Sequence, residues 1–111
     1  MATPKQLVSN VANPSIDTIK VFYTDDGTGA GTVIDAFTAA NTSTVNASYK
    51  AYITTNTGTI ENPQQPFKIV VWGDFDLGTG IINQLIPPGG TLSMESSAID
   101  SIYFTVSGKK V

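Results

Sequence analysis

Apolar and polar residues alternate in short segments along the chain. The clearest segment spans residues 44–54, where every second residue is apolar and the residues between them are polar or, at Tyr52, aromatic. The apolar positions of this segment are Val45, Ala47, Tyr49, Ala51 and Ile53. A period of two predicts a β-strand with one face toward a core and the other toward water.

Other runs of β-forming residues lie between clusters of Gly, Pro, Asn and Asp. We expect further strands over 6–12, 17–23, 32–39, 67–72, 80–86, 91–94 and 99–106. Residues 67–72 are almost continuously apolar, which favours a central strand that is buried on both faces. Residues 73–80 and 87–90 are rich in Gly and Pro, so we expect turns there.

About eight short strands, with turn signals roughly every 8 to 12 residues and no convincing helix, indicate an all-β protein. In the strand at 99–106, Ile102, Phe104 and Val106 would share a face. This pattern fits an antiparallel β-sandwich, a jelly roll or a small closed barrel.

A chain of 111 residues is too short for two domains, so a single domain over 1–111 is expected. Residues 1–7 contain Pro4 and show no apolar period, which predicts an extended N-terminal arm. Residues 108–111 are expected to form a polar tail. No segment approaches the ~18 apolar residues of a membrane span, and the first residues lack the apolar stretch of an export signal. We therefore expect synthesis in a cytoplasm and no membrane partner.

Neutral polar residues set the character of the composition. The chain has 15 Thr, 9 Ser and 7 Asn, while charged residues make up only 14%. Thr suits a pleated, partly exposed surface, and the low net charge of −3 does not match a disordered chain. The composition indicates a folded β protein with a largely uncharged surface.

Three residue types that usually supply chemistry are absent, because the sequence contains no Cys, no His and no Arg. Cys is a common nucleophile, His is the usual general base, and the Arg guanidinium binds phosphate through two hydrogen bonds. Because all three are missing, we expect neither an enzyme nor a cofactor. A nucleic-acid partner is also not expected, because such proteins carry a basic surface and this chain is acidic.

Two pairs of acidic residues are candidate metal ligands. Asp74 and Asp76 lie two positions apart in a Gly-rich segment, where carboxylates can bind Ca²⁺, but the further ligands of a calcium loop are missing. Asp25 and Asp26 precede Gly27 and fit a tight turn. We therefore expect turns that are stabilised by Asp side chains, and no metal.

Aromatic side chains suggest a different kind of site. Trp72, Tyr49, Tyr52 and Tyr103 could stack on sugar rings if they were exposed, although Trp72 follows an apolar run and is expected in the core. Tyr52 stands on the polar face of its strand and could be an anchor of a subunit contact.

Two parts of the sequence resemble small virion β-sandwich proteins of tailed bacteriophages. Residues 31–44 (Gly-Thr-Val-Ile-Asp-Ala-Phe-Thr-Ala-Ala-Asn-Thr-Ser-Thr) look like a strand and turn of those proteins. Residues 85–92 (Leu-Ile-Pro-Pro-Gly-Gly-Thr-Leu) and 99–109 (Ile-Asp-Ser-Ile-Tyr-Phe-Thr-Val-Ser-Gly-Lys) are similar to their closing strands. Length and composition also resemble the capsid decoration, or staple, proteins of epsilon-fifteen-like short-tailed phages. The resemblance covers residues 31–111 and carries no catalytic residues.

The resemblance implies a jelly-roll-like sandwich on the outer capsid surface of a virion, where many copies clip neighbouring subunits of the major capsid protein together. A homodimer at local two-fold axes is expected, since two-fold contacts are the commonest. A sugar- or receptor-binding module of a tail or fibre, and a minor tail or head-closure protein, remain alternatives.

Arms, loops and tails can adapt to a neighbouring subunit while a sandwich stays rigid, so we expect most of the contact residues there. They are Ala2, Thr3, Pro4, Lys5, Gln6, Leu7, Tyr52, Glu61, Asn62, Gln64, Gln65, Lys109, Lys110 and Val111.

Overall fold

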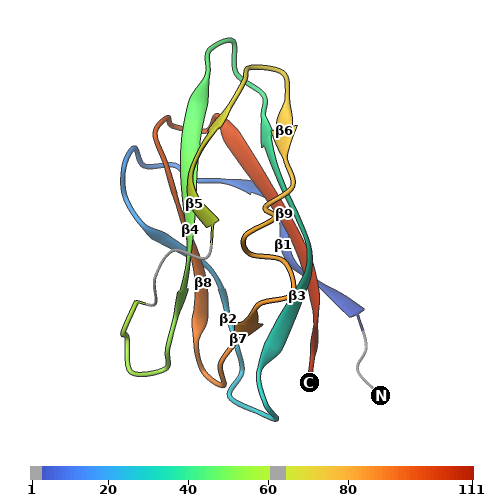
Figure 1. Cartoon of the computed structure of the whole chain (residues 1–111). Helices are drawn as coiled ribbons and strands as arrows, with labels where there is room; N and C mark the ends of the chain where they lie inside the picture. Colours follow the sequence, from blue (N-terminus) through green and yellow to red (C-terminus); the bar gives the residue numbers. More distant parts are fainter. Residues whose placement is uncertain (1–3, 61–64) are drawn as a thin grey trace.

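Nine strands form the computed structural model, which describes residues 4–60 and 65–111 (Figure 1). They are β1 (Pro4–Ala12), β2 (Lys20–Thr24), β3 (Thr32–Asn41), β4 (Ala47–Thr54), β5 (Gln65–Val70), β6 (Phe75–Asp76), β7 (Leu85–Ile86), β8 (Thr91–Ser96) and β9 (Ile102–Lys110). The described residues form no helix, so no helix among them could cross a membrane.

The strands form two antiparallel sheets that face each other. One sheet, here called sheet A, has the order β1-β9-β3-β6, with β7 also pairing with β3, and the other, sheet B, has the order β2-β8-β4-β5. The chain changes sheet between most successive strands, which is the Greek-key connectivity of a jelly roll. The prediction of an all-β antiparallel sandwich with jelly-roll topology is confirmed.

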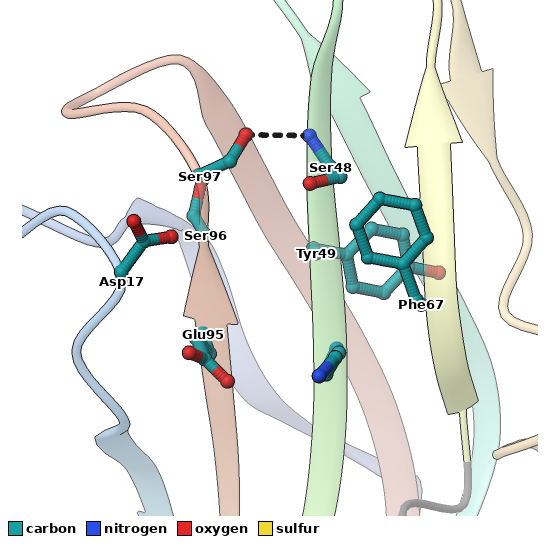
Figure 2. Close-up of a pocket in the computed structure, with 8 residues that line it drawn as sticks. Asp17, Ser48, Tyr49, Phe67, Glu95, Ser96 and Ser97 are labelled. Carbon is teal, nitrogen blue, oxygen red and sulfur yellow. Dashed lines mark hydrogen bonds between the residues drawn. The ribbon is translucent and has the colours of Figure 1, made fainter.

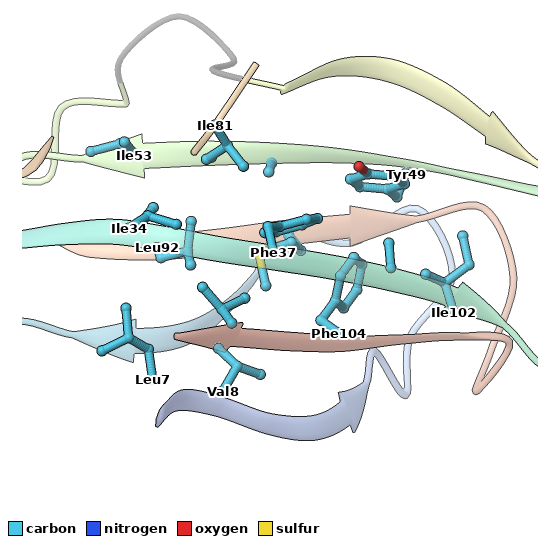
Figure 3. Packing of buried hydrophobic residues seen from close by; sticks show 14 of the residues in the cluster. Leu7, Val8, Ile34, Phe37, Tyr49, Ile53, Ile81, Leu92, Ile102 and Phe104 are labelled. Atoms are coloured by element: carbon cyan, nitrogen blue, oxygen red, sulfur yellow. The ribbon is translucent and has the colours of Figure 1, made fainter. Parts of the chain in front are cut away.

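Alternation along the central strands builds the core between the sheets (Figure 3). Every second residue of β4 is buried, as the pattern over 44–54 predicted, and Ile102, Phe104 and Val106 of β9 are completely buried. Val45, however, is exposed, because β4 begins only at Ala47. The rings of Phe37, Tyr49 and Phe104 contact one another across the core, with centroids 5.5 to 6.0 Å apart.

The segment after β6 was predicted incorrectly as a strand over 80–86. Residues 79–83 form turns instead, and only Leu85–Ile86 is a strand. Gly78, with a φ of +60°, lies against the ring of Phe37, where no other residue would fit, and Ile81 is fully buried. The turns therefore close one side of the sandwich with apolar contacts rather than with a strand.

Both ends of the described chain are strands rather than the arm and tail expected from the sequence. Pro4 pairs with Lys109 and Lys5 with Gly108, so β1 and β9 lie side by side. Beyond β9, Val111 exchanges backbone hydrogen bonds with the loop at 30–31. The predicted arm, from Pro4 on, and the predicted tail are thus parts of sheet A.

Candidate contact surface

The contact residues predicted from the sequence do not gather in one place. Ala2, Thr3, Glu61, Asn62 and Gln64 lie outside the described residues. The others are distributed over β1 (Pro4, Lys5, Gln6, Leu7), β4 (Tyr52), the start of β5 (Gln65) and the end of the chain (Lys109, Lys110, Val111).

Several of these side chains have partners within the protein. Leu7 is only 8% exposed and belongs to the core. Lys109 lies 3.7 Å from Asp35 on the surface of sheet A. Tyr52 donates a hydrogen bond to Glu95 on the neighbouring strand, and burial together with this carboxylate raises the pKa of Tyr52. Lys5 and Gln6 are exposed.

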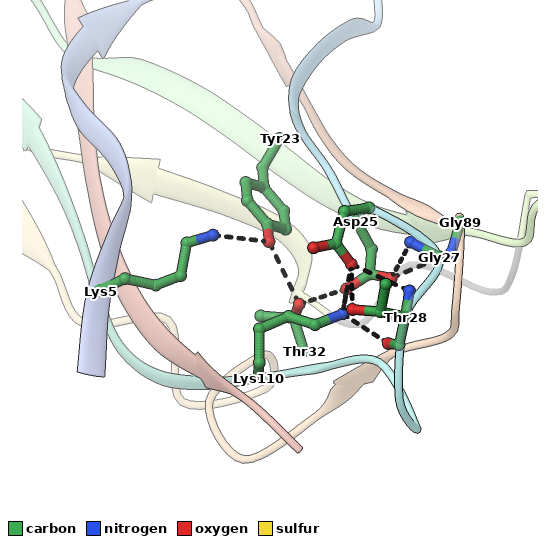
Figure 4. Close-up of polar contacts among 9 residues, drawn as sticks. Lys5, Tyr23, Asp25, Gly27, Thr28, Thr32, Gly89 and Lys110 are labelled. Atoms are coloured by element: carbon green, nitrogen blue, oxygen red, sulfur yellow. Dashed lines mark hydrogen bonds and ion pairs between the residues drawn. The ribbon is translucent and has the colours of Figure 1, made fainter. Parts of the chain in front are cut away.

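Lys110 takes part in an ion cluster that fixes the end of β9 (Figure 4). Its ammonium lies 2.6 Å from the fully buried carboxylate of Asp25 and 2.8 Å from that of Asp26. The Thr32 hydroxyl and the backbone N–H groups of Gly27 and Gly89 also donate to Asp25.

Electrostatics in this cluster favour the charged forms. Burial alone would raise the pKa of Asp25, but the hydrogen bonds from Lys110, Thr32 and the two glycine N–H groups outweigh it and hold the pKa at about 2. Lys110 and Thr28 lower the pKa of Asp26. Burial would lower the pKa of Lys110, but its two carboxylate partners raise it. Lys110 therefore stabilises the fold, a role that the sequence did not indicate.

An exposed apolar strand edge is the largest unexpected feature. β5 is the last strand of sheet B in the described part of the chain, not a central strand as predicted. Phe67, Ile69 and Val71 point to the outer side and are 57%, 64% and 49% exposed, while Val70 between them is buried. Residues 67–72 therefore place apolar side chains on the solvent side of β5 as well as on its core side.

The apolar surface continues into the loop after β5. Trp72, expected in the core, is 61% exposed, and so are Val45 in the loop before β4 and Phe75 at the start of β6. These loops are held firmly, because the buried side chain of Asn41 donates hydrogen bonds to the carbonyl groups of Val45 and Val70.

The backbone of Asn41 adds two hydrogen bonds to the same turn. Its C=O accepts from the N–H of Gly73, and its N–H donates to Asp74. Trp72 in turn donates its backbone N–H to the side chain of Asn46. The exposed apolar residues are thus displayed on a rigid support.

A shallow hollow of about 120 Å³ lies beside this surface on the outer face of sheet B (Figure 2). Phe67 stands on one side of the hollow, and the carboxylates of Asp17 and Glu95 stand on the other. Lys50 and Ser48 of β4 line it between them. The hollow combines one aromatic face with polar groups.

The acidic pairs considered as metal ligands are bonded within the protein. Asp76 accepts hydrogen bonds from the Tyr49 hydroxyl and from the N–H of Gly78, and Asp74 accepts one from the N–H of Phe75. Burial and the adjacent Asp76 carboxylate raise the pKa of Tyr49, so this hydroxyl remains a donor. Among residues 4–60 and 65–111, no three acidic side chains gather as a metal site.

Comparison with known proteins adds no relative, because no family model, no curated protein and no solved structure matches this chain. The geometry of the chain itself is therefore the basis for a function. One clue to the contact surface was present in the sequence: of the seven residues at 65–72 other than Pro66, six are apolar or amide-bearing and only Lys68 is charged.

Proposed function

We propose that this protein is a capsid decoration protein of a tailed phage, which binds the outer capsid surface and stabilises contacts between subunits of the major capsid protein. The observation that carries the proposal is the exposed apolar surface formed by Phe67, Ile69, Val71 and Trp72, here called the β5 face. Contiguous exposed apolar residues on a small protein mark a surface that binds another molecule.

Three further properties fit this role. The resemblance of residues 31–111 to virion β-sandwich proteins supplies the class of partner. The loops next to the β5 face are fixed by Asn41, so little conformational entropy is lost on binding. A protein that bridges two capsid subunits also gains avidity through effective concentration. As part of the same proposal, two copies of this protein pair at the local two-fold axes of the capsid.

Co-sedimentation with expanded capsids of the encoding phage tests the proposal. We expect saturable binding to expanded capsids and none to capsids before expansion, and particles lacking the protein should lose integrity at a lower temperature. Because the β5 face is apolar, the dissociation constant should change less than about tenfold between about 0.05 and about 0.5 M NaCl. Failure to sediment with expanded capsids would refute the proposal.

A second candidate function is binding of a sugar or receptor by a tail or fibre protein. It is favoured by the exposure of Trp72 and by the hollow, where Phe67 faces Asp17 and Glu95. Aromatic faces with nearby polar groups can bind sugar rings. A glycan array separates the two functions, since a decoration protein should bind no glycan and a receptor-binding module should bind a defined set.

A further inference from the structure

The four strands at the ends of the two sheets differ in how well they are protected against pairing with another chain. β1 has two register shifts, β2 has one in its middle, and β6 is only two residues long. Bulges and short length are the devices by which edge strands avoid unwanted pairing. β5 has one register shift as well, between Gln65 and Lys68, but it pairs regularly over Lys68–Val70 and has apolar residues on its outer side. Over Lys68–Val70, β5 is therefore a regular edge with an exposed apolar side.

The pairing of the neighbouring strand shows which backbone groups of β5 point outward. The N–H of Ser48 donates to the Ser97 hydroxyl, and the N–H of Ser97 donates to the C=O of Ser48, so the polar groups of Ser48 face β8. Backbone groups of successive strand residues point to opposite sides. Ala47 and Tyr49 therefore bond β5, through their partners Val70 and Lys68.

Ile69 lies opposite Ser48, so its N–H and C=O point away from β4. By the same alternation, the N–H of Val71 also points to the free edge, whereas Phe67 lies at the register shift between Gln65 and Lys68, where the alternation is interrupted. Outside the strand ladders, no backbone hydrogen bond between described residues uses the N–H or C=O of Ile69. These groups form a ready template for an added strand.

Lys68 affects which kind of strand could pair with this edge. Its side chain shares the inner side of β5 with the buried Val70 and is half-buried at the open margin of the sandwich. All three ion pairs among the described residues involve Lys109 or Lys110, so Lys68 has no acidic partner there. An added strand would cover this ammonium group, which then requires a carboxylate.

We propose that β5 accepts a strand from the partner protein, with apolar residues packing beside Phe67 and Ile69 and an acidic residue opposite Lys68. This inference rests on the proposed function and names the contact that it uses. A second copy of β5 is a poorer occupant, because pairing around Ile69 would place two Lys68 side chains diagonally on the same inner face with no carboxylate. Main-chain hydrogen bonds would supply affinity, and Lys68 would select the partner.

Two synthetic peptides test this on the full chain by NMR titration. One is acetyl-Thr-Val-Glu-Val-Glu-Val-Thr-amide, and the other has Lys in place of both Glu residues. We expect chemical-shift changes at the amides of 67–72 and about tenfold tighter binding of the Glu peptide, which corresponds to about 1.4 kcal/mol. Lys68→Glu should reverse the preference, while Lys20→Glu on β2 should leave it unchanged. The proposal would be overturned if the two peptides bound with equal affinity or if the chemical-shift changes were centred on β2. Dimerisation of the protein through β5 would also overturn it.

Ile69→Pro provides a second test. The N–H of Ile69 is not bonded to β4, so proline removes only a donor of the free edge, while Ile69→Ala keeps it. Ile69→Pro should abolish peptide binding and Ile69→Ala should retain it, with unchanged melting of both variants as the control for folding. If Ile69→Pro does not fold, the Lys68→Glu variant alone tests the strand contact.

The results also separate this inference from the proposed function. Peptide binding at β5 without capsid binding would refute the capsid function only. Capsid binding that is unaffected by Lys68→Glu would refute the strand contact only.

Discussion

The carboxylate of Asp25 joins three separate parts of the chain at one end of the sandwich. It binds the Lys110 ammonium of β9, the hydroxyl of Thr32 at the start of β3 and the N–H of Gly89 in the turn before β8. A buried charge with this many partners is costly to disturb, since loss of one partner leaves the others desolvated. This residue therefore contributes to the stability of the fold.

Asp25→Asn should lower the free energy of unfolding at neutral pH by about 1 to 2 kcal/mol. The folded-state pKa of about 2 lies below the ordinary value of 3.8, so the stabilisation is present above about pH 4 and is lost as the pH falls toward 2. Urea unfolding between about pH 2 and about pH 7 measures this free energy. Between about pH 2 and about pH 4, the free energy of unfolding of the variant should change less with pH than that of the unsubstituted protein.

Asp35→Asn is the matched control, because Asp35 also faces a lysine of β9 but is exposed. Exposed ion pairs contribute little, so this change should alter the free energy of unfolding by less than about 0.5 kcal/mol. Equal effects of the two substitutions would contradict the assignment of Asp25 as a buried structural charge.

At the scale of elements, β5 combines the features of a core strand and of a surface. Val70 packs inward, and Ile69 projects outward with backbone groups that, by the alternation along the strand, point away from β4. Such an edge invites aggregation unless it is covered, and Lys68 on its inner side limits pairing to strands that bring a carboxylate. The exposed apolar side of β5 and its preference for an acidic partner strand thus come from two adjacent residues, Ile69 and Lys68.

Amide hydrogen exchange tests the orientation of β5 directly. The N–H groups of Lys68 and Val70 should be protected by pairing with β4, and the N–H of Ile69 should exchange more than about tenfold faster than either. Comparable protection of Ile69 and Val70 would show that the edge is already occupied and would contradict the proposed strand contact.

Some elements could be predicted from the sequence because their pattern is local. The alternation around Tyr49 and that from Ile102 to Val106 predicted which faces are buried, since each side chain in a strand alternates between core and solvent. The strand predicted over 17–23 spans Lys20–Thr24, where Val21 is exposed and the register shift after it brings both Phe22 and Tyr23 against the core.

Other elements could not be predicted, because they depend on distant partners. The pairing of Pro4 with Lys109 turned an expected arm and tail into two neighbouring strands, and no local propensity contains that information. The apolar run ending at Trp72 was read as buried because apolar residues usually are. A sequence does not distinguish a side chain buried in its own core from one that another molecule covers.

The described part of the molecule is a β-sandwich with few charges and with exposed apolar side chains along the edge strand β5. Its net charge is −3, and the three ion pairs of the described residues lie at β9, away from β5 in sheet B. Attraction over long distances therefore contributes little, and contact by shape and backbone pairing is what this surface offers. A protein of this kind suits a repeated binding surface, such as that of a capsid.

Copy number in the virion tests the central claim most directly. Purified particles of the encoding phage would be separated on a denaturing gel, and the amount of this protein would be compared with that of the major capsid protein by densitometry. A decoration protein should be present in hundreds of copies, in a fixed ratio to the major capsid protein. A dozen copies or fewer, or its absence from the particle, would contradict the assignment.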